Sequence, residues 1–317
     1  MKTWVGERAK GAPPAYRFEE LPQPVPGPGE VLIRVRAVGL NLVDRFPKRQ
    51  HFQHTPPSPA AIPGMEVAGE AVETGKRVMA MVHAGCAEYA VAHESLLMPI
   101  PGAMSWTDAA AIPVAFLTAH DALVTQGRFR DGQALLVQGV TTGVGLAAVQ
   151  LARVLSAAIV AGTSRSPEKL ERVRALGLTL AIPSGEGVAQ AMLDASVGRD
   201  ADVVLDHIGA RALKETLLAT AVGGRIVNIG RYAGTRGEID LETLALRRIS
   251  LIGVTFRTRS LEEHGAVVRA FLAQHAKDLE SGALKPVVDR ILPFSELPQA
   301  IARAERGEQF GKLVLEL

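Results

Sequence analysis

Hydrophobic and polar positions repeat with two different periods, and the change of period divides the chain. Over 31–38 the period is two, with Ile33 and Val35 on one face and Arg34 on the other, which predicts a half-exposed strand. Further short strands are predicted at 66–73, 77–83 and 87–92. The chain is therefore expected to be rich in β-structure up to about residue 112.

From 113 to 258, short apolar runs alternate with segments of helical period. Strands are predicted at 134–138, 157–162, 179–182, 202–206, 225–229 and 249–254, and helices at 143–155, 167–176, 187–196, 210–220 and 241–246. This alternation favours an α/β fold with a doubly wound parallel sheet. Ser260 and Glu263 form a capping-box pattern that predicts a helix to about 281. A strand (287–291), a helix (295–306) and a strand (312–316) are predicted to follow.

The stretch 134–155 reads ALLVQGVTTGVGLAAVQLARVL, a buried strand, a glycine-rich turn and a helix. Unpaired N–H groups at the start of such a helix suit a pyrophosphate. In a G-x-G-x-x-G frame only Gly145 falls on a motif glycine, and threonines stand where the second glycine is usual. The predicted pyrophosphate contacts are Thr141, Thr142, Gly143 and Val144. The alternative is a strand–turn–helix unit that binds nothing.

The end of the next predicted strand indicates which dinucleotide would bind. Sites for NAD place an acid about 20 residues after the glycine turn, to accept from the ribose hydroxyls. Here Ser164 and Arg165 occupy that region, Lys169 follows, and no acid precedes Glu168. A 2'-phosphate would be held by the two cations, so the sequence favours NADP(H). The alternative is an ordinary charged helix start.

Composition narrows the class of protein and its expected location. The 317 residues are 47% hydrophobic and 21% charged, with a net charge of +2, typical of a globular enzyme. The arginines are scattered rather than clustered, so no nucleic-acid partner is expected. Cys86 is the single cysteine, which excludes internal disulfides and a cysteine-rich zinc lobe. No signal segment or long apolar run is evident, so we expect a cytoplasmic protein without membrane attachment.

Several short motifs occur together in a familiar order along nearly the whole chain. They include PGEV at 28–31, VGLNLVD at 38–44, PGMEVAG at 63–69, AEY at 87–89, the glycine turn, GGR at 223–225 and GKLV at 311–314. The chain resembles the zinc-independent quinone oxidoreductase branch of the medium-chain dehydrogenase/reductase superfamily, which includes zeta-crystallin.

The resemblance implies a domain organisation and an assembly. A GroES-like β-rich catalytic domain would comprise 1–112 and 259–317, and an inserted Rossmann domain that binds NADP(H) would comprise 113–258. Members of the family usually form homodimers through the last Rossmann strand, which lies between Ile249 and Val254 here.

The resemblance also implies chemistry without a metal. Zinc-dependent relatives bind the ion at positions that match Asn41, Met65 and Val114, none of which is a good zinc ligand. His51 and His54 lack a third ligand nearby in sequence, so together with Phe52 they are assigned to a substrate-facing loop. An enzyme without a strong Lewis acid needs an electrophilic hydride acceptor, and quinones or enones fit.

The remaining site residues follow from position within the family motifs. Asn41 is expected to stabilise charge on the acceptor oxygen, and Asp44 to fix its loop by hydrogen bonds. Contacts near the nicotinamide are expected from Thr118, Asn228, Ile229, Gly230 and Arg231. The predicted function is NADPH-dependent hydride transfer to a small-molecule quinone or enone. The alternatives are an alkenal or enoyl double-bond reductase, and a non-catalytic NADPH-binding protein with a structural or redox-sensing role.

Overall fold

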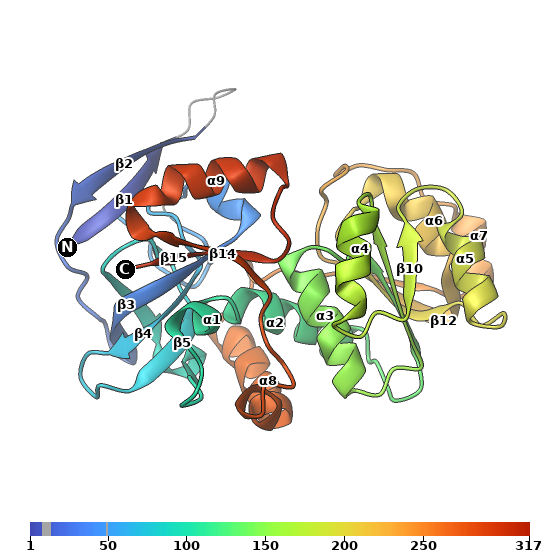
Figure 1. The fold of residues 1–317 in the computed structure, drawn as a ribbon, viewed down its shortest axis with the longest axis horizontal. Coiled ribbons are helices and arrows are strands. Elements are labelled where there is room, and N and C mark those ends of the chain that lie inside the picture. Colours follow the sequence, from blue (N-terminus) through green and yellow to red (C-terminus); the bar gives the residue numbers. More distant parts are fainter. Residues whose placement is uncertain (8–13, 49) are drawn as a thin grey trace. The chain divides into compact units, whose positions relative to one another are not determined.

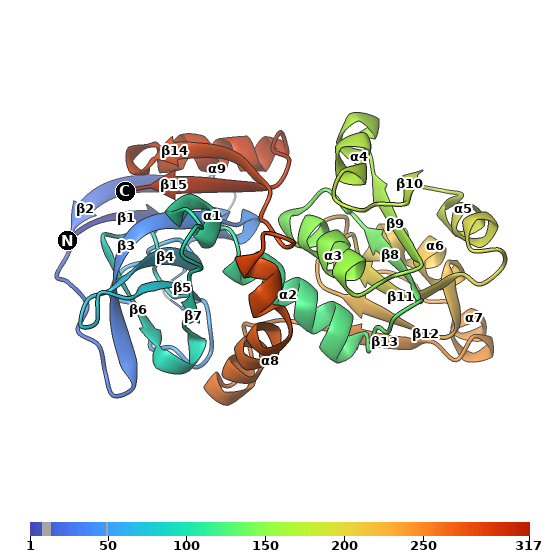
Figure 2. The ribbon, with the colours of Figure 1, turned by 60° about the horizontal axis from the view of Figure 1, so that its bottom comes forward.

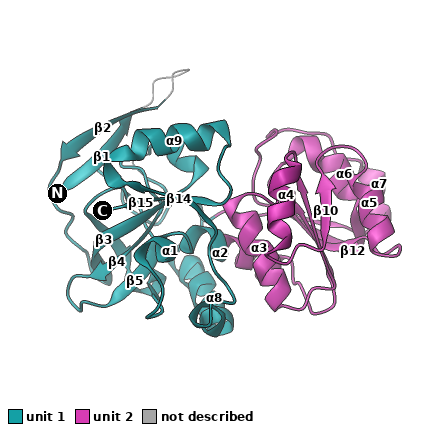
Figure 3. Ribbon diagram, viewed as in Figure 1, with its two compact units in different colours: residues 1–117, 256–317 teal, residues 118–255 magenta. Residues whose placement is uncertain are grey.

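The computed structural model describes residues 1–7, 14–48 and 50–317, which form two compact units (Figure 3). Unit 1 comprises Met1–Leu117 and Phe256–Leu317, and unit 2 comprises Thr118–Thr255. In the described ranges, no helix has the length and apolar character needed to cross a membrane.

Unit 1 is built on a mixed sheet that the two ends of the chain share (Figure 1). Its strands are β3 (Glu30–Leu40), β4 (Glu66–Ala71), β5 (Arg77–Met81), β6 (Tyr89–His93), β7 (Met98–Pro99), β14 (Val288–Pro293) and β15 (Lys312–Glu316). The order is β14-β15-β3-β4-β5-β7, and β6 also pairs with β3. The pairing of β15 with β3 is antiparallel and brings the C-terminal segment beside the residues that lead into Asn41.

The alternation predicted over 31–38 is confirmed only over 33–37, because Leu32 before it and every residue after it in β3 are buried. Leu32, Ile33 and Val35 are buried and Arg34 is exposed. From Ala37 onward every residue of β3 is buried, because β4 and β15 flank the strand and helix α1 (Trp106–Ala110) packs on it. This second half therefore reads as a continuous apolar run.

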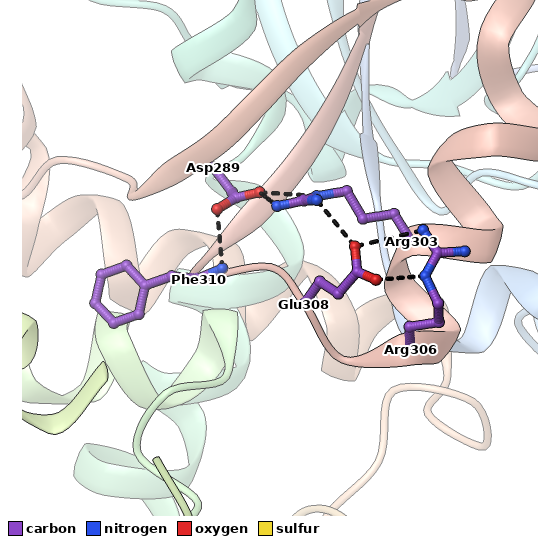
Figure 4. Close-up of polar contacts among 5 residues, drawn as sticks. All are labelled: Asp289, Arg303, Arg306, Glu308 and Phe310. Atoms are coloured by element: carbon purple, nitrogen blue, oxygen red, sulfur yellow. Dashed lines mark hydrogen bonds and ion pairs between the residues drawn. The ribbon is translucent and has the colours of Figure 1, made fainter. Parts of the chain in front are cut away.

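The loop before β15 is held by charged side chains from β14 and helix α9 (Leu297–Arg306), as Figure 4 shows. Asp289 accepts from the Phe310 backbone N–H at 3.1 Å and from the Arg303 guanidinium at 3.0 Å. Arg303 also donates to Glu308 at 3.0 Å, and Arg306 pairs with Glu308. These contacts fix the turn from which β15, and with it Lys312, begins.

Unit 2 is the predicted doubly wound parallel sheet. Its strands are β8 (Ala134–Gln138), β9 (Ile159–Ser164), β10 (Leu180–Pro183), β11 (Ala201–Asp206), β12 (Thr220–Asn228) and β13 (Ser250–Gly253), in the order β10-β9-β8-β11-β12-β13. The helices are α3 (Gly143–Val154), α4 (Pro167–Arg174), α5 (Val188–Ala195), α6 (Leu213–Leu218) and α7 (Leu241–Leu246). Helices α3 and α4 lie on one face of the sheet, and α5 and α6 on the other (Figure 2). The strand–helix alternation read from the sequence is confirmed.

Several elements of the described chain were not predicted from the sequence. They include the strands β1 (Lys2–Glu7), β2 (Ala15–Glu20) and β7, helix α1, and helix α2 (Pro113–His120) with its π-helical extension Asp121–Gln126. Strand β2 is largely exposed and carries no strict alternation. Helix α2 is apolar on nearly all sides, so it shows no helical period to detect. The long helix α8 (Leu261–Glu280), in contrast, begins at the predicted Ser260–Glu263 capping box.

Candidate active site

The predicted cofactor residues of unit 2 gather at the carboxyl ends of its parallel strands. The glycine turn follows β8, Ser164 ends β9, and Asn228 ends β12. Strand order reverses between β8 and β11, which is the position where open α/β sheets bind their ligands. The structure therefore brings these residues, far apart in sequence, to one edge of one sheet.

The turn after β8 presents free backbone N–H groups at the start of α3. The Thr142 hydroxyl caps the helix, since it accepts from the Gly145 N–H at 3.0 Å. The N–H groups of Gly143 and Val144 have no acceptor among the described residues. Gly145 is required by close packing, because a Cβ there would lie 2.5 Å from the Val140 carbonyl oxygen. The turn retains the geometry of an anion site with threonines in place of one glycine.

The end of β9 carries the residues expected around a 2'-phosphate. The Ser164 hydroxyl is 3.4 Å from that of Thr141 and accepts from the Ser166 N–H at 3.2 Å. Arg165 is exposed, and within the described chain it forms no ion pair. Lys169 lies in the first turn of α4, whose N-cap is Ser166. A hydroxyl and two cations thus lie within six residues at the carboxyl end of β9.

The loop after β12 is organised by Asp206, a buried residue that the sequence reasoning missed. One Asp206 oxygen accepts from the N–H groups of Ile208 and Gly209 at 2.8 and 2.9 Å, and the other accepts from the Asn228 amide at 3.0 Å. The Asn228 amide also donates to the Gly230 carbonyl at 3.2 Å. Both amide hydrogens of Asn228 are thus engaged, and its side-chain oxygen retains its capacity to accept a hydrogen bond.

The other residues predicted after β12 also have defined places. The Ile229 N–H donates to the Asp206 carbonyl at 2.8 Å, and Arg231 is exposed. Gly230 approaches β11 closely, since a Cβ there would lie 2.7 Å from the His207 carbonyl oxygen. Thr118 is half-buried on α2.

A buried polar network supports the glycine turn from beneath. The Thr163 hydroxyl donates to the side-chain oxygen (Oε1) of Gln138 at 2.8 Å and accepts from the Gly139 N–H at 3.0 Å. The Gln138 amide donates in turn to the Thr216 hydroxyl at 3.1 Å. Polar residues inside apolar runs were the available signal, because buried polar groups are kept where they are hydrogen-bonded.

In unit 1, Asn41 is held by an ion pair between β4 and β15. Its amide donates to Glu66 at 2.9 Å, and its carbonyl oxygen accepts from Lys312 at 2.7 Å. Lys312 also pairs directly with Glu66, which accepts from the Val114 backbone N–H at 2.7 Å. Glu66 is fully buried, and Lys312 is 6% exposed. The amide of Asn41 is thereby oriented, and its second N–H has no partner in the described part of the chain.

The sequence reasoning placed Asn41 at the site but missed Glu66 and Lys312. Both lie inside quoted family stretches, PGMEVAG and GKLV, and a charged residue within an apolar strand was the signal. The two charges can be buried because they pair with each other, since the burial of an isolated charge costs much free energy.

Asp44 accepts hydrogen bonds that shape the loop after β3. Its two carboxylate oxygens accept from the backbone N–H groups of Asn41 at 2.7 Å and Gly64 at 3.1 Å. Burial raises the pKa of Asp44 to about 7, although these hydrogen bonds and nearby Lys312 act in the opposite direction. The carboxyl group connects two backbone segments around Asn41.

The predicted substrate loop packs against α8. The His51 N–H donates to His83 Nδ1 at 3.1 Å, Phe52 is 1% exposed, and His54 Nε2 lies 3.2 Å from His264 Nδ1. Phe52 stacks on His54, with ring centroids 5.6 Å apart. Burial lowers the pKa of His264 to about 3 and that of His51 to about 4, so both imidazoles are neutral at pH 7.

Comparison with known proteins identifies the family. Residues 143–272 match the family model described as zinc-binding dehydrogenase, and residues 27–102 match the alcohol dehydrogenase GroES-like domain. The solved quinone oxidoreductase from Thermus thermophilus, also determined in complex with NADPH, is 34% identical and aligns over 100% of both chains with a TM-score of 0.85. A solved NAD-dependent alcohol dehydrogenase is 29% identical over 100% of both chains, with the same TM-score of 0.85.

A curated relative supports the same assignment. Human quinone oxidoreductase is 29% identical over 324 residues, covering 97% of this chain and 95% of its own length. The chain belongs to the medium-chain dehydrogenase/reductase superfamily, in its quinone oxidoreductase-like branch.

The residues at the zinc-matching positions do not fit the metal in the name of the family model. Asn41 is committed to Glu66 and Lys312, and Met65 and Val114 offer no thiolate, imidazole or carboxylate. Within the described ranges, no cluster of three or more His, Cys, Asp or Glu side chains has a metal-binding arrangement. The zinc chemistry of the metal-dependent relatives is therefore not assigned to these positions.

Proposed function

We propose that this protein is an NADPH-dependent oxidoreductase that reduces a quinone or another electrophilic enone. The observation that carries the proposal is the oriented Asn41 amide, with one free N–H, in a chain whose relatives include quinone oxidoreductases. The NADPH complex of the Thermus thermophilus enzyme supports the choice of cofactor.

The residues of unit 2 would bind and orient the cofactor. The N–H groups of Gly143 and Val144, with the Thr141 hydroxyl, would receive the pyrophosphate. Ser164, Arg165 and Lys169 would surround the 2'-phosphate. The segment from Asn228 to Arg231, together with Thr118, would border the nicotinamide. When bound, NADPH supplies the hydride, and the protein supplies orientation and electrostatics.

The residues of unit 1 would act on the acceptor. Hydride arrival builds negative charge on the acceptor oxygen, and a donor held in advance stabilises that charge without reorganising. Asn41 is such a donor, because Glu66 and Lys312 fix both ends of its amide. Asp44 would position this loop through its bonds to Asn41 and Gly64. A proton from water completes the reduction.

The test is cofactor oxidation by chelator-treated protein. NADPH and NADH would be compared with 1,4-benzoquinone, 9,10-phenanthrenequinone and an aliphatic enone as acceptors. Quinone-dependent turnover that prefers NADPH and survives chelation is the expected result. Turnover confined to enones would favour the double-bond reductase alternative. Tight NADPH binding without turnover would favour either a substrate outside these three acceptors or a structural or redox-sensing protein.

We propose that the protein forms a homodimer through β13. This strand is the edge of the unit 2 sheet, and Leu251 on it is 47% exposed. Leu246 of the preceding helix is 70% exposed, so apolar surface accompanies an unpaired strand edge, which proteins usually cover.

Light scattering coupled to size-exclusion chromatography tests the dimer. Wild type is expected at twice the mass of the chain, and Leu251→Lys at the mass of one chain. Leu193→Lys, at an exposed position of α5, is the matched control and should stay dimeric. A monomeric wild type contradicts the proposal.

We propose that this protein resides in the cytoplasm. The reducing conditions there would keep Cys86, its single cysteine, as the buried free thiol that the structure shows.

A further inference from the structure

Unit 1 contains a cavity that adjoins the predicted substrate loop and extends beyond it. Its volume is about 320 Å³, at the lower end of small-molecule sites. Its lining comes from the loop before β3, the substrate loop, the ends of β5 and β6, and the first residue of α8. Five segments distant in sequence thus border one space inside one unit.

Apolar side chains form a large part of the walls, and Glu30, Thr55 and His83 are among the polar residues that share the lining. Met81 and Val82 from the end of β5, Ala92 from β6, and Leu96 just beyond it line the cavity and are almost fully buried. Phe52 contributes an aromatic wall, and its stacking on His54 keeps the ring in place. A ligand that fills such a space gains by burying a ring or a chain of similar size.

His93 supplies a hydrogen-bond donor whose orientation and tautomer are defined. Its Nδ1 accepts from the Ser95 backbone N–H at 3.2 Å, as the N-cap of the short helix that follows β6, and it also lies 2.9 Å from the Ser95 hydroxyl oxygen, which can donate to it. In a neutral imidazole the proton then resides on Nε2. Among the described residues, Nε2 has no hydrogen-bond partner. The atom is not fully buried, so a ligand can reach it.

The charge beside the cavity disfavours anionic ligands. Glu30, half-buried on the lining, accepts from the Gly27 N–H at 2.8 Å and opposes an anionic ligand. Burial lowers the pKa of His54, with nearby His93 acting in the same direction, so His54 is neutral at pH 7. Its contact with His264 requires one of the two rings to be unprotonated. An uncharged ligand is compatible with all of these groups.

We propose that this cavity binds an uncharged ring compound that bears one acceptor oxygen, with that oxygen receiving the Nε2 hydrogen of His93. The inference goes beyond the proposed function and does not depend on it, because binding is measured without turnover. The ring can belong to the hydride acceptor itself or to a separate ligand, and competition distinguishes these two sources.

The test uses α-tetralone, a fused-ring ketone, and tetralin, which has the same rings without the oxygen. Isothermal titration calorimetry on the full chain is expected to show tetralone binding more tightly than tetralin. His93→Asn keeps an N-cap acceptor, and its shorter side chain places no donor at the position of Nε2. It should weaken tetralone binding about three- to tenfold and leave tetralin unchanged, as the loss of one hydrogen bond predicts.

Leu261→Trp fills the cavity at its half-buried rim and should abolish binding of both probes. Glu262→Trp places the same side chain on the neighbouring exposed position and should bind both like wild type. Circular dichroism verifies that the variants are folded.

Inhibition of quinone reduction by tetralone distinguishes the two sources of the ring. Competitive inhibition shows that the cavity binds the hydride acceptor, and non-competitive inhibition shows that it binds a separate ligand. Equal affinity of wild type and folded His93→Asn for tetralone, or undiminished binding by Leu261→Trp, would overturn the proposal.

Discussion

Arg165 and Lys169 illustrate what single side chains contribute to selectivity between cofactors. They lie at the end of β9 and in the first turn of α4, beside the Ser164 hydroxyl. A 2'-phosphate carries the charge that separates NADPH from NADH, and charge-assisted hydrogen bonds are the strong ones. These two residues are therefore expected to determine the preference.

Replacing Arg165 and Lys169 together with Ala should weaken NADPH binding at least tenfold and NADH binding less than twofold. The magnitude follows from about 1.5–3 kcal/mol for a hydrogen bond to a charged group. Cofactor fluorescence titration measures both affinities. Arg174→Ala is the control, since this exposed residue of α4 pairs with Glu171. Equal losses for the two cofactors would reject the 2'-phosphate assignment.

At the scale of elements, β4 and β15 are connected across the sheet by a buried ion pair. Glu66 and Lys312 are separated by 246 residues, and β3 lies between their strands. The pair also holds Asn41 and the first turn of α2 through Val114. One interaction thereby positions three segments of unit 1.

Lys312→Met should lower the free energy of unfolding by about 3–5 kcal/mol, because it leaves the Glu66 carboxylate buried without its cation. The double variant Glu66→Gln with Lys312→Met should recover part of this loss, since no charge remains buried. Urea unfolding followed by circular dichroism gives both values. A double variant less stable than Lys312→Met would contradict this account.

At the scale of the whole molecule, buried histidines make the fold sensitive to acid. Burial lowers the pKa of His51 and His207 to about 4 and that of His264 to about 3. Below pH 6.5 these histidines bind protons in the unfolded chain but stay neutral in the folded protein. The free energy of unfolding therefore falls as the pH drops from about 6.5 to 4. Asp44 opposes this trend between pH 7 and 4, since its raised pKa gives the folded state the extra proton.

His207→Leu should reduce the loss of stability between pH 6.5 and 4, by up to about 3 kcal/mol. His207 is 2% exposed, and its Nε2 has no hydrogen-bond partner among the described residues. Urea midpoints at pH 7.5, 6 and 4.5 give the slope, and the value at pH 7.5 corrects for the change in packing. An unchanged slope would show that other groups determine the acid sensitivity.

The sequence by itself determined the features that depend on neighbouring residues. Helical period, the Ser260–Glu263 capping box and the glycine turn are local, and each appears in the structure where it was predicted. The parallel sheet of unit 2 followed from the same local alternation. The roles assigned to Asn41, Arg165 and the other site residues remain predictions for the experiments above.

The tertiary structure alone decided which distant residues meet. The contact of Lys312 with Asn41 spans 271 residues, that of His54 with His264 spans 210, and the cavity draws on five segments. Strand β2 and helix α2 likewise carry no periodic signal of their own. The physical reason is that local spacing encodes the burial of one face. Pairing of buried charges and enclosure of a cavity depend instead on how faces formed far apart in the chain pack together.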